Sequence, residues 1–260
     1  MMLQFDYDMQ LTYSAPIHMC HFTIKCLPKN TCRQRLVSKE LSLTPPVVYS
    51  EGEDSYGNGT IYGHVPQPHD FFEFHIKGQV EILPIDYEEE VQPGRLGMYK
   101  YPSGKCIAGP NIKKYFDSLK LDLQKNPFDL AMSIMERLHQ NFSYVPSTTQ
   151  VETDAEAAFS QGTGVCQDYA HIFITLLRLA GIPARYVCGL LVGEGASHAW
   201  VEAAIDGKWI GMDPTNNCLV KDSHIKLGDG RDATECAINR GIMRGNCAQS
   251  QKVTALVSQQ

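Results

Sequence analysis

Cys166, His198 and Asp213 are the three residues of this sequence whose types could together perform thiol chemistry. A neutral thiol is a modest nucleophile, a nearby imidazole can take its proton, and a carboxylate can fix the imidazole tautomer and stabilise its protonated form. Each residue alone also has an ordinary structural interpretation, as a buried cysteine, a strand histidine or a turn aspartate before Pro214. The surrounding elements decide whether the three side chains meet.

The cysteine is predicted to lie in the first turn of a helix. The glycine-rich stretch 162–164 precedes it, and the helical pattern runs from about Val165 to Ala180, where Gly181 and Pro183 end it. The positive end of the helix dipole and unpaired backbone N–H groups stabilise a thiolate at such a position. The same N–H groups could hold the oxyanion that forms when sulfur attacks an acyl carbon.

The histidine and the aspartate are predicted to lie on a β-hairpin. Residues 184–192 are expected to form a strand and residues 193–197 a loop, followed by strands over 198–205 and 208–213. Asp206-Gly207 joins the last two strands, and Asp-Gly between apolar runs is a strong signal of a two-residue hairpin turn.

The turn fixes which residues of the hairpin face one another. Ile205 pairs with Lys208, so Asp213 comes to lie opposite Trp200. His198 and Asp213 then become diagonal neighbours on one face, with backbones roughly 7–8 Å apart and side chains within reach. A shift of the register by one residue would separate them.

Five further residues near these positions have open roles. Gln161 and Tyr144 could donate to an oxyanion, although surface or packing roles fit them equally well. Trp200 could shield the ion pair or line an acyl pocket, and aromatic packing is its simpler interpretation. Asp168 and His171, three residues apart on the predicted helix, are interpreted as structural groups that bond each other or cap nearby backbone.

The first third of the chain is predicted to be an antiparallel β-sandwich. Segments rich in β-branched and aromatic residues fall at 10–13, 18–26, 34–43 and 70–83, and a Gly57-Asn58-Gly59 turn lies among them. Cys20 and Cys26 alternate with apolar residues as a buried strand face does, so we interpret them as structural cysteines and not as metal ligands.

The remaining two thirds are predicted to be mixed α and β. Residues 84–109 are rich in proline, glycine and acidic residues and are interpreted as a solvated connection, including Glu88-Glu89-Glu90. Asn126 and Pro127 predict a helix start, and Thr153 with Glu156 predicts a capping box for another short helix. The expected domains are an all-β domain over 1–100 and a catalytic core over 101–260 that includes a C-terminal β segment.

Composition limits the partners and the location. Of 260 residues 43% are hydrophobic, and 23 basic against 29 acidic residues give a net charge of −6 without any Lys/Arg run. Nucleic acid and membranes are therefore not expected as partners. With neither a signal-like N-terminus nor a long apolar window, we expect a cytoplasmic protein. Nine widely spaced cysteines are expected to be free thiols, and no metal-ligand spacing occurs, so no cofactor or metal is expected.

The same residues resemble a known family. The resemblance lies in GTGVCQDYAH at 162–171, LAGIPAR at 179–185, SHAWVE at 197–202 and DPT at 213–215, which are similar to the core of the transglutaminase-like superfamily. Residues 142–146 with Thr153 and Glu156 resemble the lead-in of bacterial members, and segments at 230–232, 240–241 and 245 resemble their C-terminal part. The β-rich first third resembles the region that accompanies this core in bacteria. By this resemblance, Cys166, His198 and Asp213 map onto the catalytic positions.

The resemblance implies chemistry but not one reaction. Superfamily members include cross-linking transferases, amide hydrolases, peptidases and proteins that have lost activity, and active members share an acyl-thioester route. Because we expect a cytoplasmic, bacterial-type protein and no calcium-loop pattern is present, we expect water as the acceptor, and hence a peptidase or amidase that acts on a peptide or protein substrate. Protein cross-linking is the alternative. A non-catalytic peptide-binding module is a second alternative. Loss of one of the three residues would have indicated such a module, and all three are present.

Overall fold

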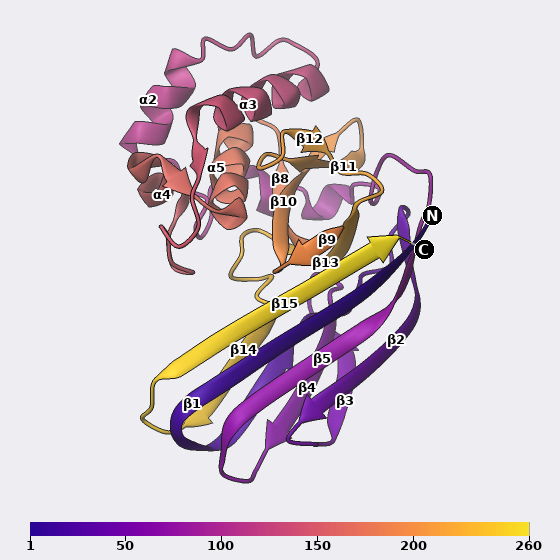
Figure 1. Cartoon of the computed structure of the whole chain (residues 1–260). Coiled ribbons are helices and arrows are strands. Elements are labelled where there is room, and N and C mark those ends of the chain that lie inside the picture. The colour runs from indigo at the N-terminus through magenta and orange to yellow at the C-terminus, as the bar shows by residue number, and fades with distance from the viewer. Residues whose placement is uncertain (260) are drawn as a thin grey trace.

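The computed structural model describes residues 1–259, with a long β-sandwich below and a mixed α and β part above (Figure 1). Five strands come from the first third of the chain. They are β1 (Met2–Ile24), β2 (Gln34–Thr44), β3 (Tyr49–Glu53), β4 (Gly59–Val65) and β5 (His69–Ile82). The alternation at residues 20, 22, 24 and 26 points these side chains into the sandwich core, as predicted.

The long strand β1 takes part in both layers of the sandwich. Its first half lies in the order β2-β5-β1-β15-β9, and its second half pairs with β4 and β14, while β3 pairs with β4. The pairing with β5 shifts between Thr12 and Ile17, where the strand passes from one layer to the other. Apolar side chains such as Phe5, Phe74 and Ile61 fill the space between the layers. The predicted antiparallel β-sandwich is confirmed.

The end of the chain returns to this sandwich. Strands β14 (Asn239–Arg244) and β15 (Gln249–Gln259) both pair antiparallel with β1, and β15 does so from Leu3 to Tyr13. Figure 1 shows β15 lying along β1 in the front layer. The boundary at residue 100 stays a prediction, but the C-terminal β segment that we assigned to the catalytic core is part of the N-terminal sandwich.

The upper part packs helices on a five-stranded antiparallel sheet of order β12-β11-β10-β8-β13. The sheet strands are β8 (Ala184–Leu191), β10 (His198–Ile205), β11 (Lys208–Asp213), β12 (Cys218–Leu219) and β13 (His224–Gly230). Short strands β6 (Ser143–Tyr144) and β7 (Thr163–Gly164) pair with each other, and β9 (Gly193–Gly195) pairs with β15. The helices are η1 (Pro93–Arg95), α1 (Gly97–Lys100), α2 (Pro110–Ser118), α3 (Pro127–Asn141), α4 (Ala155–Gln161) and α5 (Cys166–Leu179). Within residues 1–259, no helix is long and apolar enough to cross a bilayer.

Helix starts follow their capping residues, with one correction. Asn126 accepts a hydrogen bond from the backbone N–H of Phe128 and begins α3 as predicted. The capping box at Thr153 was wrong, because Asp154 is the N-cap of α4 and accepts from the N–H of Ala157. Glu156 instead accepts from two N–H groups at the start of α2, so this carboxylate joins two helices.

The hairpin that carries the histidine has the predicted register. Ile205 pairs with Lys208 and Val201 with Met212, and both turn residues have the positive φ that a tight Asp-Gly turn requires. The preceding loop was predicted incompletely, because three of its residues form β9. The register places His198 and Asp213 at the same end of the sheet.

The acidic run at 88–90 is not a solvated connection, contrary to our interpretation. Glu88 is buried and pairs with Arg33, and Glu89 contacts both Arg185 and Lys29. These pairs continue into a buried group of charges, in which the ammonium of Lys226 lies 2.9 Å from Glu202 and 2.9 Å from Asp229. Burial without such partners would be unfavourable, so the run joins the sandwich to the core sheet.

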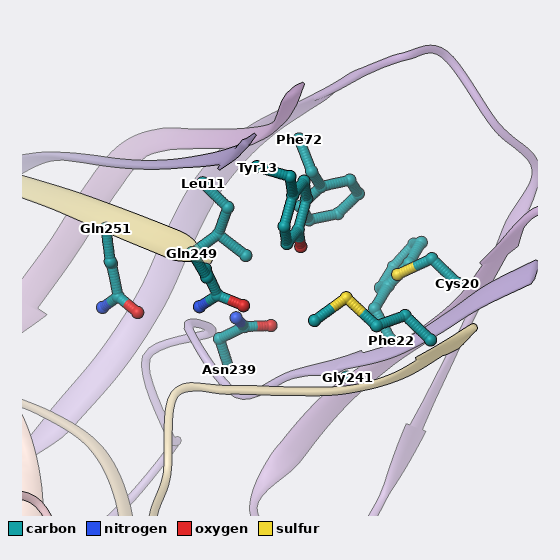
Figure 2. Close-up of a pocket in the computed structure, with 10 residues that line it drawn as sticks. Leu11, Tyr13, Cys20, Phe22, Phe72, Asn239, Gly241, Gln249 and Gln251 are labelled. Atoms are coloured by element: carbon teal, nitrogen blue, oxygen red, sulfur yellow. The ribbon is translucent and has the colours of Figure 1, made fainter. Parts of the chain in front are cut away.

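The sandwich also contains a cavity of about 230 Å³ near β14 and the start of β15. Figure 2 shows the amide side chains of Asn239, Gln249 and Gln251 on one side of it and the aromatic rings of Tyr13 and Phe72 on the other. None of the three predicted catalytic residues lines this cavity.

Candidate active site

Cys166 is the first residue of α5, and Val165 is the N-cap. The first N–H groups of a helix lack intrahelical acceptors, so the thiol lies beside backbone donors at the positive end of the helix. The carboxylate of Asp168 accepts from the N–H of Val165 at 2.8 Å and from the hydroxyl of Thr149 at 2.6 Å. These bonds hold the turn that presents the thiol.

His198 reaches the site from the start of β10 and lies beside both other residues. Its Nε2 lies 2.8 Å from Oδ2 of Asp213, and the thiol of Cys166 is close enough to raise the pKa of the imidazole. Because Nε2 is directed at the carboxylate, Nδ1 is the nitrogen left for the sulfur. Sequence reasoning predicted these three residues, and the structure brings them together at the meeting point of α5 and the core sheet.

Asp213 is fully buried and accepts hydrogen bonds from five donors. Oδ1 accepts from the N–H groups of Thr215 and Asn216, which follow it in the turn. Oδ2 accepts from the side chains of His198, Asn216 and His224. A carboxylate with this many donors stays ionised and has one orientation.

The electrostatics favour a charged histidine beside a charged aspartate. Burial alone would lower the pKa of His198, but its hydrogen bonds with Asp213 and Cys166 outweigh burial and raise the pKa to about 10. Burial alone would raise the pKa of Asp213, but the hydrogen bonds from His198 and His224 outweigh it and hold the pKa well below its usual range. An imidazolium at neutral pH is the partner that a thiolate needs.

The other predicted site residues differ in how close they lie to Cys166 and His198. Gln161 donates to the carbonyl of Thr148 and to the hydroxyl of Thr163, so its amide is already engaged. Tyr144 is half exposed and pairs with Gly164, which places this residue near the start of α5. Trp200 is fully buried behind His198, which fits the packing interpretation.

Asp168 and His171 do not bond each other. Asp168 is the capping group described above, and His171 accepts from the N–H of Ala233 through Nε2. Burial lowers the pKa of His171 to about 3, so it is a neutral core histidine. Both contacts agree with the structural interpretation of these residues.

Sequence reasoning missed His224. It begins β13 and is buried, and its Nε2 lies 3.2 Å from Oδ2 of Asp213. No spacing or turn signal ties this residue to the hairpin, because β13 pairs with β8 and not with β11.

His198, Asp213 and His224 also offer three ligand atoms within 4.8 Å of one another, a spacing that one metal ion could bridge. The same atoms are joined by hydrogen bonds in the structure. Each Nε2 that donates to Asp213 carries a proton, which a metal ion would have to displace. Hydrogen bonding therefore accounts for this arrangement by itself.

The chain is similar to two family models and to several known proteins. Residues 118–214 match the model of the transglutaminase-like superfamily, and residues 3–81 match the bacterial transglutaminase-like N-terminal region. An uncharacterized protein of Mycobacterium tuberculosis is 29% identical over 266 residues, which span 86% of this chain and 81% of that protein. A protein-glutamine gamma-glutamyltransferase of Pseudomonas aeruginosa is 31% identical over 122 residues, which span 41% of this chain and 18% of that protein.

A solved structure has the same fold over the whole chain. It is a candidate cysteine protease from Cytophaga hutchinsonii, with a TM-score of 0.79 at 22% sequence identity, covering 100% of this chain and 92% of that one. At this identity the likeness shows the fold, which unites the sandwich and the helix-on-sheet core in one arrangement.

Proposed function

The chain belongs to the transglutaminase-like superfamily, and on that premise we propose that it is a thiol-dependent hydrolase of peptide or amide bonds. The observation that carries the proposal is the 2.8 Å contact of His198 with Asp213, beside Cys166 at the start of α5, which is close enough to raise the pKa of the imidazole. This contact supplies a nucleophile, a proton carrier and a group that orients the carrier. Unpaired N–H groups at the helix start supply donors for an oxyanion.

The proposed reaction has two steps. The sulfur of Cys166 attacks the carbonyl carbon, and the oxyanion forms beside the helix N-terminus. The imidazolium of His198 then gives its proton to the departing amine, the C–N bond breaks, and a thioester remains on Cys166. In the second step neutral His198 takes a proton from water as the hydroxide attacks the thioester. The C–S bond then breaks, the carboxylic acid leaves, and the thiolate of Cys166 and the imidazolium of His198 are restored. Asp213 keeps its charge throughout and stabilises the imidazolium.

Transfer to an amine is the second candidate. The Pseudomonas aeruginosa relative, which matches 41% of this chain, is named a protein-glutamine gamma-glutamyltransferase. The two reactions share the first step and differ only in whether water or an amine resolves the thioester. We favour water, because the thiol is partly exposed and water is present at a far higher concentration than any amine.

The test is to incubate the protein with a set of peptides and carboxamides and to follow products by mass spectrometry. We expect cleavage by the unaltered protein, none by Cys166→Ala, and an adduct on Cys166 after rapid acid quenching. A chelator should leave the rate unchanged, since no step uses a metal ion. An added fluorescent primary amine separates the candidates, because incorporation in preference to hydrolysis would favour transfer.

Equal activity of Cys166→Ala and the unaltered protein would overturn the proposal. Loss of activity on stripping a stoichiometric metal, with recovery on its return, would overturn it as well. Specific peptide binding that survives in Cys166→Ala, with turnover in neither protein, would instead identify a peptide-binding module.

A further inference from the structure

We infer that His224 is a positioning residue of the active site, which acts through Asp213 by holding its carboxylate toward His198. This inference rests on the proposed function and adds a fourth side chain to it. His224 touches neither the thiol nor any substrate position in the described contacts. Its effect on the reaction would therefore pass entirely through the carboxylate that it binds.

The contact geometry places both imidazoles on one oxygen. Oδ2 of Asp213 lies 2.8 Å from Nε2 of His198 and 3.2 Å from Nε2 of His224. The two rings approach from neighbouring directions, with centroids 6.1 Å apart, and Trp200 packs edge-on against His224 at 5.2 Å. The indole of Trp200 and the carboxylate of Asp213 together hold the His224 ring in one orientation.

The hydrogen-bond directions around His224 are fixed by its neighbours. An ionised carboxylate only accepts, so Nε2 of His224 must carry the proton. Nδ1 lies 3.0 Å from the hydroxyl of Ser223 and can accept from it. Burial lowers the pKa of His224, and the nearby charges of His198 and Arg33 oppose its protonation, so the ring is a neutral donor. A neutral donor orients Asp213 without cancelling the negative charge that His198 needs.

The backbone of His224 is held from the N-terminal part of the chain. Arg33 donates to the carbonyl of Lys221 at 3.1 Å and to the carbonyl of His224 at 3.1 Å. Gln34 exchanges two hydrogen bonds with the backbone of Lys226, both at 2.8 Å. β13 is the outer strand of the core sheet, so these bonds replace the partner strand that it lacks on that side. The sandwich thereby fixes the histidine that fixes Asp213.

The experiment compares His224→Leu with His224→Gln. Leucine removes the donor and keeps an apolar side chain, whereas the terminal amide of glutamine can offer an N–H near the position of Nε2. We expect leucine to lower kcat by roughly 10-fold to 100-fold with little change in KM, as loss of one hydrogen bond to a charged group would. Glutamine should restore most of that loss.

A second readout is the rate of Cys166 alkylation as a function of pH. His224→Leu should shift this profile, because a loosened Asp213 holds the imidazolium less well, and His224→Gln should not. His171→Leu is the matched control, since it removes another buried neutral histidine with one hydrogen bond, from outside this cluster. His171→Leu should lower the melting temperature and leave the pH dependence of Cys166 alkylation unchanged.

The outcomes separate this inference from the proposed function. Fast alkylation in the unaltered protein that depends on His198, together with unchanged kcat and profile in His224→Leu, would refute the positioning role alone. A parallel fall of kcat in His224→Leu, His224→Gln and His171→Leu, following melting temperature, would refute it too. Slow alkylation in the unaltered protein would instead refute the proposed function.

Discussion

At the scale of single residues, the site depends on one oxygen atom that serves several partners. Oδ2 of Asp213 orients His198, and the turn residues 215–216 hold the other oxygen. The sequence could predict Cys166, His198 and Asp213, because a helix start and a two-residue turn place them by local rules. It could not predict His224, since the strand pairing that brings this residue to Asp213 leaves no short-range pattern.

Asp213→Asn should preserve the fold and reduce turnover strongly. Asparagine keeps one acceptor for the turn N–H groups but loses the charge that stabilises the imidazolium. The corresponding change in a hydrolase triad lowers kcat by about 10⁴-fold, and for a cysteine nucleophile, which depends less on a general base than a serine does, we expect on the order of 10²–10³-fold.

Asp168→Asn is the control for that variant. Asp168 caps the turn before α5, so its change should chiefly lower the melting temperature. Turnover of a peptide or amide substrate and melting curves should be measured for both proteins. Near-normal turnover by Asp213→Asn would leave a Cys–His dyad, and lost turnover at normal stability in Asp168→Asn would make Asp168 the functional acid.

The pH dependence of kcat/KM should show an alkaline limb near pH 10. His198 is protonated below its pKa of about 10 and loses the proton that the departing amine requires above it. Alkylation of Cys166 needs no such proton, so its rate should not fall in the same range. Asp213→Asn should move the limb to lower pH, because it removes the partner that raises this pKa. An alkaline limb that Asp213→Asn leaves in place would contradict the assignment.

At the scale of elements, turn and capping residues predicted the features that depend on neighbours in the sequence. The register of the β10–β11 hairpin followed from its Asp-Gly turn, α3 begins after its predicted cap Asn126, and α5 spans nearly the predicted residues. The predictions were wrong where the hydrogen-bond partner comes from a segment that is distant in the sequence. Glu156 bonds the start of α2 instead of its own helix, and residues 193–195 pair with the last strand of the chain.

Gly189→Ala should disturb the strand that pairs with His198. Gly189 lies opposite His198 on β8, and an added Cβ would lie 2.2 Å from the indole of Trp200 and 2.3 Å from the carbonyl of Ile225. We expect a loss of about 1–3 kcal/mol in the free energy of unfolding, with a fall in turnover as Trp200 presses on the histidine.

Gly195→Ala is the matched control, because a Cβ on this glycine of β9 would meet no atom within 4 Å. Denaturant unfolding and turnover of both variants provide the measurement. Equal stability of the two variants would mean that the sheet accommodates a Cβ at Gly189 without strain.

At the scale of the whole molecule, the two parts are joined by buried charges and by the return of the chain. Arg33 pairs with Glu88 and bonds the start of β13, and β15 completes the sandwich layer that β1 begins. The sandwich was predictable from its alternating residues. Its completion by residues 239–259 was not, because pairing across more than two hundred residues depends on the finished fold.

Arg33→Met should destabilise the protein far more than Arg35→Met. Removing Arg33 leaves Glu88 buried and unpaired, which should reduce the free energy of unfolding by about 3–5 kcal/mol. The Arg35–Glu81 pair two residues later is exposed, so its loss should change that free energy by less than about 1 kcal/mol. Urea unfolding tests the difference, and the double variant Arg33→Met with Glu88→Gln should recover part of it. Equal effects of Arg33→Met and Arg35→Met would show that the buried Arg33–Glu88 pair does not hold the sandwich to the core sheet.

The most direct test of the activated thiol is the rate at which each cysteine reacts with iodoacetamide at neutral pH, followed by mass spectrometry. Cys32, Cys218 and Cys247 are the internal controls, because they are half-buried thiols like Cys166 and lack a histidine at a helix start. The account predicts that Cys166 reacts about tenfold faster or more than these three, and that His198→Ala removes the advantage. Labelling of Cys166 at the rate of the controls, or an advantage that persists in His198→Ala, would contradict it.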